Sequence, residues 1–121
     1  MLDTVNNLGL LYYKQGRLKE AEDMYNRALR GYEKALRVPM VNTYPPALIT
    51  MENLGNLLQH VGRSEEAQKY YLRAEGGVRL VYGSGSKRWL EIISKLRRLI
   101  HGHPALDIWA PEGTSSASSE P

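Results

Sequence analysis

Cysteine is absent from this sequence of 121 residues, which excludes disulfide bonds, thiolate metal sites and a thiol nucleophile. The absence also fits a reducing compartment. Long apolar runs are missing too, since stretches such as "LGLLYY" at residues 8–13 are far too short to span a bilayer. The first residues lack the basic start and the small-residue cleavage site of a signal peptide. We therefore expect a soluble, cytoplasmic protein that does not enter a membrane.

A large excess of charge is also lacking, because the formal net charge is only +3. The basic residues are nevertheless uneven. Between positions 79 and 98 the single acid Glu91 stands against Arg79, Lys87, Arg88, Lys95, Arg97 and Arg98. Several cations on one surface can hold phosphates, and Trp89 could stack on a base. The same residues are also typical of a solvated helix face, so nucleic-acid binding is a third and less favoured function.

Apolar residues in the first third of the chain recur at helical spacing. Val5, Leu8 and Tyr12 predict one helix, which Gly16 ends. A second series predicts a helix over about residues 18–37, and it consists of Leu18, Ala21, Tyr25, Ala28, Leu29, Tyr32 and Leu36. Residues 1–37 should therefore form a helical hairpin. Three prolines then predict a connector without helix over residues 38–46.

A second hairpin is predicted over residues 47–82, with a turn at Gly62 and with Ser64 as the N-cap of its second helix. Glycine and serine at residues 83–86 predict another connector. One further helix is expected over residues 87–101. Its predicted apolar stripe consists of Leu90, Ile93, Leu96 and Ile100, widened by Trp89, Ile92 and Leu99. The composition of residues 102–121, rich in serine, proline and glycine, predicts a disordered tail.

Residues 52–75 repeat residues 6–29. The identical residues of the first copy are Asn7, Leu8, Gly9, Gly16, Arg17, Glu20, Ala21, Tyr25 and Ala28, and those of the second are Asn53, Leu54, Gly55, Gly62, Arg63, Glu66, Ala67, Tyr71 and Ala74. A lone hairpin would leave its apolar face in water, whereas stacked hairpins cover one another. Gly9 and Gly55 should let the two helices of each hairpin approach closely.

These residues resemble the tetratricopeptide repeat, which sets apolar residues, Leu-Gly, aromatic residues and alanines at fixed offsets. The matching positions are Val5, Leu8, Gly9, Tyr12, Ala21, Tyr25 and Ala28, then Met51, Leu54, Gly55, Leu58, Ala67, Tyr71 and Ala74. Glu33 and Arg79 replace the proline that usually closes the motif, and the second helix is prolonged as in kinesin light chains. The resemblance implies an all-α, right-handed α-solenoid of two hairpins. The helix over residues 87–101 would cap it as a degenerate third repeat, with Arg97 in place of the glycine.

The resemblance also implies a non-enzymatic scaffold for protein–protein interactions. In this family the first helices of successive repeats line a concave groove for an extended peptide or a partner helix. The groove candidates are Asn6, Asn7, Leu10, Tyr13, Lys14, Glu52, Asn53, Asn56, Lys95 and Arg98, and Ile49, Gln59 and His60 share the same face. Asparagine suits such a groove because its amide both donates and accepts hydrogen bonds. Ordinary solvated surface explains these residues equally well.

One alternative is a terminal piece of a larger array, either of the kinesin-light-chain type or from a NACHT or NB-ARC sensor, with no ligand of its own. A clamp for a terminal carboxylate, which some members of the family form, is not expected. Only Asn53 matches that clamp outright, and Glu91 would repel the carboxylate.

Cofactors, metals and catalysis are not predicted. "GSGSK" at residues 83–87 lacks the glycine–lysine–hydroxyl order of a phosphate-binding loop. His101 and His103 supply only two of the four ligands that a structural zinc site needs. No nucleophile motif is present, so we expect neither an enzyme nor a small-molecule substrate.

Overall fold

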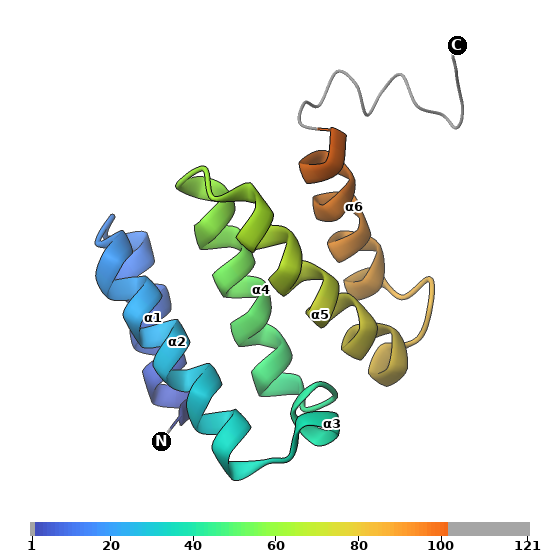
Figure 1. Ribbon diagram of the computed structural model, residues 1–121, viewed down its shortest axis with the longest axis horizontal. Helices are drawn as coiled ribbons and strands as arrows, with labels where there is room; N and C mark the ends of the chain where they lie inside the picture. Colours follow the sequence, from blue (N-terminus) through green and yellow to red (C-terminus); the bar gives the residue numbers. More distant parts are fainter. Residues whose placement is uncertain (1, 102–121) are drawn as a thin grey trace.

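The computed structural model describes residues 2–101, and these residues form helices and short connections without a strand. The helices are α1 (Leu2–Lys14), α2 (Leu18–Ala35), α3 (Val38–Val41), α4 (Pro45–His60), α5 (Ser64–Tyr82) and α6 (Lys87–His101). Figure 1 shows the hairpin of α1 and α2 beside the hairpin of α4 and α5, with α6 after the second hairpin. The predicted all-α solenoid of two hairpins with a capping helix is confirmed. The tail predicted over residues 102–121 lies outside the described residues.

Proline does not break the helices where the sequence predicted it. Pro39 is the second residue of α3, and Pro45 and Pro46 begin α4. The first-turn N–H groups of a helix have no intrahelical acceptor, so a proline loses nothing there, and its fixed φ already suits the helix. The expectation of a connector without helix over residues 38–46 is therefore corrected. These prolines lie in the first turns of α3 and α4, where proline is tolerated.

The start of α5 also differs from the prediction. The residue before the helix is Arg63 and it makes no side-chain cap, so Ser64 is the first helical residue rather than the N-cap. Arg63 instead binds Glu66 within the helix, with 2.6 Å between Nε and Oε1. Its other guanidinium nitrogen lies 2.8 Å from the Glu22 carboxylate of α2. An ion pair between the two hairpins thus stands where a cap was expected.

Two glycines allow the close helix crossings that the repeat predicted. A Cβ added to Gly9 would lie 2.8 Å from the Tyr25 ring, and one added to Gly55 would lie 2.6 Å from the Tyr71 ring. Real Cβ atoms do not approach other atoms so closely, and an interior packed this tightly cannot relax freely. The expectation of close approach at Gly9 and Gly55 is confirmed. In each hairpin the ring of a tyrosine of the second helix contacts a glycine of the first.

The core centres on α4, which packs between α1, α2 and α5. Its buried residues are Ala47, Leu48, Thr50, Met51, Leu54, Gly55, Leu57 and Leu58. By contrast, on α1 only Asn6 and Gly9 are buried among residues 3–14. Neighbours on several sides thus enclose the middle helix of the stack, and they leave the first helix largely open.

Helix α6 packs on α5 with one edge of its predicted apolar stripe rather than with the centre. Ile92 and Leu96 are buried, and Trp89 and Leu99 pack against the core. The Trp89 indole N–H donates to the Glu75 carboxylate at 2.8 Å. Leu90 and Ile100 were predicted within the stripe but are 52% and 61% exposed. Apolar residues lie around more than half of this helix, and periodicity alone could not show which side meets α5.

Candidate functional site

A hollow of about 480 Å³ lies where the last turns of α1 and α4 meet α6. Six side chains line it: Tyr13 from α1, Asn56, Gln59 and His60 from α4, and Lys95 and Arg98 from α6. We call it the groove hollow. It brings together four of the predicted groove candidates, namely Tyr13, Asn56, Lys95 and Arg98. The C-terminal halves of α1, α4 and α6 therefore form one concave site.

Internal hydrogen bonds orient the amides of the groove hollow. The Tyr71 hydroxyl donates to Asn56 Oδ1 at 2.5 Å and lies 3.2 Å from Gln59 Oε1. These contacts engage the amide oxygens, and so leave the two NH₂ groups as donors toward a ligand. Burial, followed by the charge of Glu52, raises the pKa of Tyr71 well above its ordinary value. Tyr71 therefore stays a neutral donor at physiological pH.

The electrostatics of the groove hollow favour an anionic ligand. Lys95 is half-buried and Arg98 is exposed, and both line the hollow. The Lys95 ammonium lies 5.8 Å from the centre of the Tyr71 ring, a cation–π distance that directs it inward. His60 packs edge-on against Tyr13, with 5.9 Å between ring centres. The hollow thus offers two cations, two amide donors and aromatic surface.

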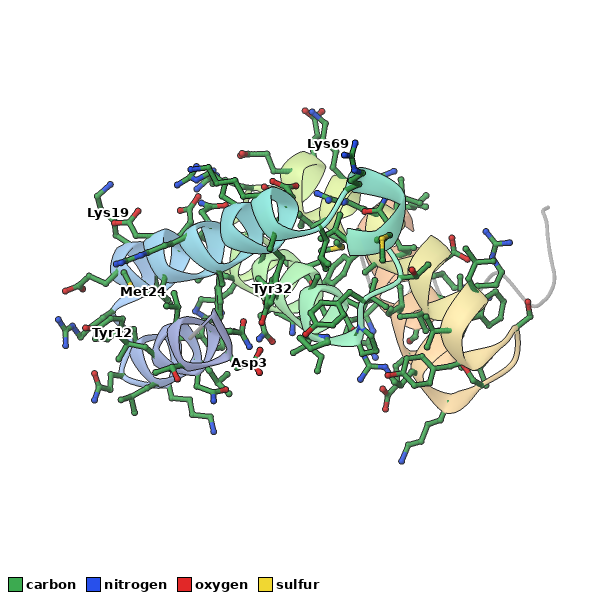
Figure 2. The ribbon with its side chains drawn as sticks, turned by 90° about the horizontal axis from the view of Figure 1, so that it is seen from below. Asp3, Tyr12, Lys19, Met24, Tyr32 and Lys69 are labelled. Carbon is green, nitrogen blue, oxygen red and sulfur yellow. The ribbon has the colours of Figure 1, made fainter. Side chains whose placement is uncertain are left out.

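A smaller hollow of about 210 Å³ lies at the other end of the same face, where α1 and α4 begin. Asp3, Asn6, Asn7, Tyr32, Pro46 and Ile49 line it. The Tyr32 hydroxyl donates to the Asp3 carboxylate, and the two side chains meet between α1 and α2 in Figure 2. This end is the more acidic, so the concave face is polarised along the helix axes.

Two of the predicted groove asparagines make hydrogen bonds between α1 and α4. Asn6 is only 8% exposed, and its Oδ1 accepts from the Thr50 hydroxyl at 2.9 Å. The Asn53 amide donates to the same oxygen at 3.4 Å. Asn7 is exposed beside them. Asn6 and Asn53 thus join α1 to α4, and Asn6 also lines the smaller hollow. Their role in binding a peptide stays a prediction.

The remaining candidates are placed individually. Glu52 is paired with Arg88 of α6 at 2.5 Å, so it holds α6 to α4. Burial raises the pKa of Glu52 above its ordinary value, although the Arg88 charge opposes this effect. Leu10 is half-buried and Lys14 is exposed, and neither lines the groove hollow or the smaller hollow.

The basic residues of α6 point in different directions. Arg88 binds Glu52 and stacks 5.0 Å from the centre of the Tyr82 ring. Lys95 and Arg98 line the groove hollow, while Arg97 does not. Trp89 is held by Glu75 and the core rather than free to stack on a base. The cations therefore do not form one stripe that could follow a phosphate backbone.

The described residues hold neither a metal-ligand cluster nor a membrane-spanning helix. Within residues 2–101, His, Asp and Glu do not form a group of three or more that could hold a metal ion. Over the same residues, every helix is too short or too polar to cross a bilayer. His103, the second predicted zinc ligand, lies outside the described part of the chain.

Comparison with protein families decides what the repeated hairpins are. Family models described as tetratricopeptide repeat match residues 1–36 and residues 50–75. The chain is a tetratricopeptide repeat protein. The first tetratricopeptide match covers α1 and α2, and the second covers most of α4 and α5. No curated protein matches the chain.

Tetratricopeptide repeats indicate a protein-interaction scaffold with protein partners, and the family is typically non-enzymatic. The predicted repeat family is thus confirmed. The groove hollow lies at the ends of the helices that begin each repeat, together with α6. The amide–tyrosine contacts and the burial of Asn6 depend on how helices cross, and no local sequence signal reports such a crossing.

Proposed function

We propose that this tetratricopeptide repeat protein is a non-enzymatic scaffold that holds an extended, acidic peptide segment in the groove hollow. The observation that supports the proposal is the convergence of α1, α4 and α6 on one concave site with two cations and two oriented amides. A volume of about 480 Å³ is in the range of sites that hold a few residues or a small ligand. An acidic side chain would meet Lys95 and Arg98.

An extended backbone suits the chemistry of the groove hollow. The NH₂ groups of Asn56 and Gln59 can donate to peptide carbonyls, because Tyr71 already engages their oxygens. Each well-formed hydrogen bond to a peptide adds about 1 kcal/mol net, so several are needed for micromolar binding. We propose a weak, sequence-tolerant contact with a preference for acidic residues.

We also assign the repeats to the long, kinesin-light-chain type and the protein to the cytoplasm. The second helices α2 and α5 have 18 and 19 residues, which supports the long type. The absence of cysteine supports the reducing compartment. The competing function, a terminal piece of a larger array without its own ligand, predicts that the groove hollow binds no peptide.

A positional-scanning library of fluorescent heptapeptides, with Glu or Lys held at each position in turn, tests the proposal. We expect the Glu pools to bind the full chain more tightly than the Lys pools. A Lys95→Glu, Arg98→Glu double variant should lose this preference, with binding weakened about tenfold or more, because two cations become repulsive.

The matched control is Lys19→Glu, Lys69→Glu, which changes the net charge equally. Lys19 and Lys69 project from the α2 and α5 side of the molecule in Figure 2, away from the groove hollow. This control should bind like the unaltered chain. Equal weakening in the control, or no saturable binding of any pool at about 1 mM, would contradict the proposal.

A further inference from the structure

The geometry points to a second interaction surface, separate from the groove hollow. It is the side of α6 that carries the exposed residues Leu90, Arg97 and Ile100 and the half-buried Ile93, and we call it the end face. We propose that the end face binds an amphipathic helix of a partner protein, and that this helix places an Asp or Glu against Arg97.

The first step is that α6 repeats the packing of α4. Ile92 and Leu96 are buried against the preceding hairpin, as Thr50 and Leu54 are buried at the corresponding places on α4. Helix α6 packs on α5 as α4 packs on α2, and the buried positions of the two helices correspond. The neighbouring side of each helix can then be compared position by position.

The second step is the contrast on that neighbouring side. On α4 it carries Leu48, Met51 and Leu58, which are at most 1% exposed because α5 covers them. The corresponding residues of α6 are Leu90, Ile93 and Ile100, of which Leu90 is 52% and Ile100 is 61% exposed. Within residues 2–101, no helix covers the end face as α5 covers α4. Its shape and apolar spacing therefore fit a helix in the position that α5 takes on α4.

The third step defines the chemistry of that helix. At the middle of the contact α4 has Gly55, which admits the Tyr71 ring. The same place on α6 is Arg97. The Arg97 side chain occupies the space that Gly55 leaves open, so an aromatic ring could not approach the α6 backbone as Tyr71 approaches that of α4. A carboxylate would instead form a charge-assisted pair with it. The partner helix is therefore apolar on one side and acidic where α5 has Tyr71.

The fourth step separates this partner from a second copy of the chain. Two copies that shared the end face by two-fold symmetry would bring the same patch against itself. Arg97 of each copy would then approach Arg97 of the other, and Glu91 does not lie on the same side of the helix to offset the repulsion. Charge thus favours a different, acidic helix over self-association.

The probe is a fluorescent peptide with the sequence of residues 64–82 and the changes Tyr71→Glu, Gly76→Ala and Gly77→Ala. A Cβ at residue 77 would lie 1.9 Å from the Asn42 carbonyl oxygen, so the peptide cannot replace the chain's own α5. Both alanines raise its helix propensity. A second probe carries Tyr71→Lys in place of Tyr71→Glu.

Fluorescence anisotropy with the full chain provides the measurement. We expect the Glu probe to bind at least about fivefold more tightly than the Lys probe. The Glu probe forms one exposed ion pair with Arg97, whereas the Lys probe places a like charge there. Arg97→Glu should reverse this order. Lys87→Glu, with the same change in charge on the same helix, should leave the order unchanged. Because Arg97 is exposed, its replacement should not alter the melting temperature.

Three outcomes would overturn the proposal. One is that the Glu probe shows no saturable binding at about 1 mM. Another is that Lys87→Glu changes the ratio of Glu-probe to Lys-probe affinity as much as Arg97→Glu does. The third is a different occupant: a dimer in sedimentation that Arg97→Glu changes, or a benzoylphenylalanine crosslink from position 100 to residues 102–121 of the same chain.

Discussion

The two hairpins share their defining residues but not their burial. Leu8 and Leu11 on α1 are 36% and 50% exposed, whereas their counterparts Leu54 and Leu57 on α4 are each 1% exposed. Both helices use the same glycine against the same tyrosine. The difference arises because α4 packs against α1, α2 and α5, while α1 lies at one end of the stack. The repeat motif thus specifies how the two helices of a hairpin cross. The position of the hairpin in the array decides how deeply its first helix is buried, and so how much that helix contributes to stability.

The tyrosines at the two crossings show a second difference. The Tyr71 hydroxyl donates to Asn56 of its hairpin and lies 3.2 Å from Gln59 Oε1. At the corresponding places α1 has Leu10 and Tyr13, so an amide partner is lacking in the first hairpin. Burial raises the pKa of Tyr25 to about 12. The second hairpin therefore uses its tyrosine both for packing and to orient the groove hollow.

The largest effect should come from Gly77, where the second hairpin meets the connector. A Cβ there would lie 1.9 Å from the Asn42 carbonyl oxygen and 2.5 Å from Leu48 Cδ2. Gly77→Ala should therefore lower the free energy of unfolding by about 3 kcal/mol, measured by urea denaturation. Gly76→Ala is the control, since its Cβ would meet open space. It should raise stability by about 0.5–1 kcal/mol, and equal effects of the two changes would refute the close approach.

The next effect directly compares the two crossings. Gly55→Ala should cost about 2 kcal/mol and Gly9→Ala about 1 kcal/mol, although both Cβ atoms would strike a tyrosine ring. Tyr71 is held by hydrogen bonds at the centre of the stack, whereas Tyr25 can shift with the open helix α1. Thermal unfolding of the two variants measures the difference. A larger cost at Gly9 would mean that position in the array does not set stability.

A smaller effect, which depends on pH, concerns the Arg88–Glu52 pair that holds α6. Arg88→Met should destabilise the protein by about 1 kcal/mol at neutral pH, because Glu52 loses its partner. Burial already raises the pKa of Glu52, and removal of Arg88 raises it further. The folded variant then binds the proton more tightly than the unfolded chain. Its deficit should therefore be smallest below the unfolded-state pKa of about 4.3 and grow as the pH rises through the folded-state pKa.

Urea unfolding at several pH values tests this dependence, with Arg97→Met as the control for loss of a cation from the same helix. Arg97 is exposed, and its loss should cost little at any pH. A deficit for Arg88→Met that does not change with pH would mean that Glu52 is not the partner that matters.

The smallest effect is expected at the ion pair between the hairpins. Glu22→Gln removes the contact with Arg63, whose side chain is 42% exposed. The cost should be at most about 0.5 kcal/mol, and it should disappear in about 1 M salt. Glu65→Gln, an exposed change nearby, serves as the reference. A cost above about 1 kcal/mol would show that this pair couples the hairpins more strongly than exposed pairs generally do.

Local sequence was sufficient for much of the fold. Gly9 and Gly55 predicted that the two helices of each hairpin approach closely, because a residue without a side chain lets the backbones come together. That Tyr25 and Tyr71 are the side chains in contact with these glycines was not predicted, since the two tyrosines were expected between the hairpins. The prediction that proline prevents a helix over residues 38–46 was wrong, since Pro45 and Pro46 are the first two residues of α4. Ser64 was misjudged because Arg63 found partners from two helices, one of which is distant in sequence.

The candidate site was less accessible from sequence than the fold. Lys95 and Arg98 were predicted at the groove and line it. The hydrogen bonds that Asn6 and Asn53 make between α1 and α4 could not be read from sequence, because one residue of rotation decides whether an amide meets a ligand or a neighbouring helix. The rotation of α6 was missed for the same reason. Apolar residues that surround a helix leave its orientation to tertiary contacts.

The enclosure of α4 has a consequence for how the molecule opens. Either end of the stack can detach alone: α1 leaves with few buried side chains, and α6 leaves with Ile92 and Leu96 as its main buried contacts. Helix α4 cannot become accessible until its neighbours have separated. Its amide protons should therefore exchange with solvent only through global unfolding, while those of α1 and α6 exchange through partial openings. We therefore expect the cooperative unit of this protein to be α4 together with α2 and α5.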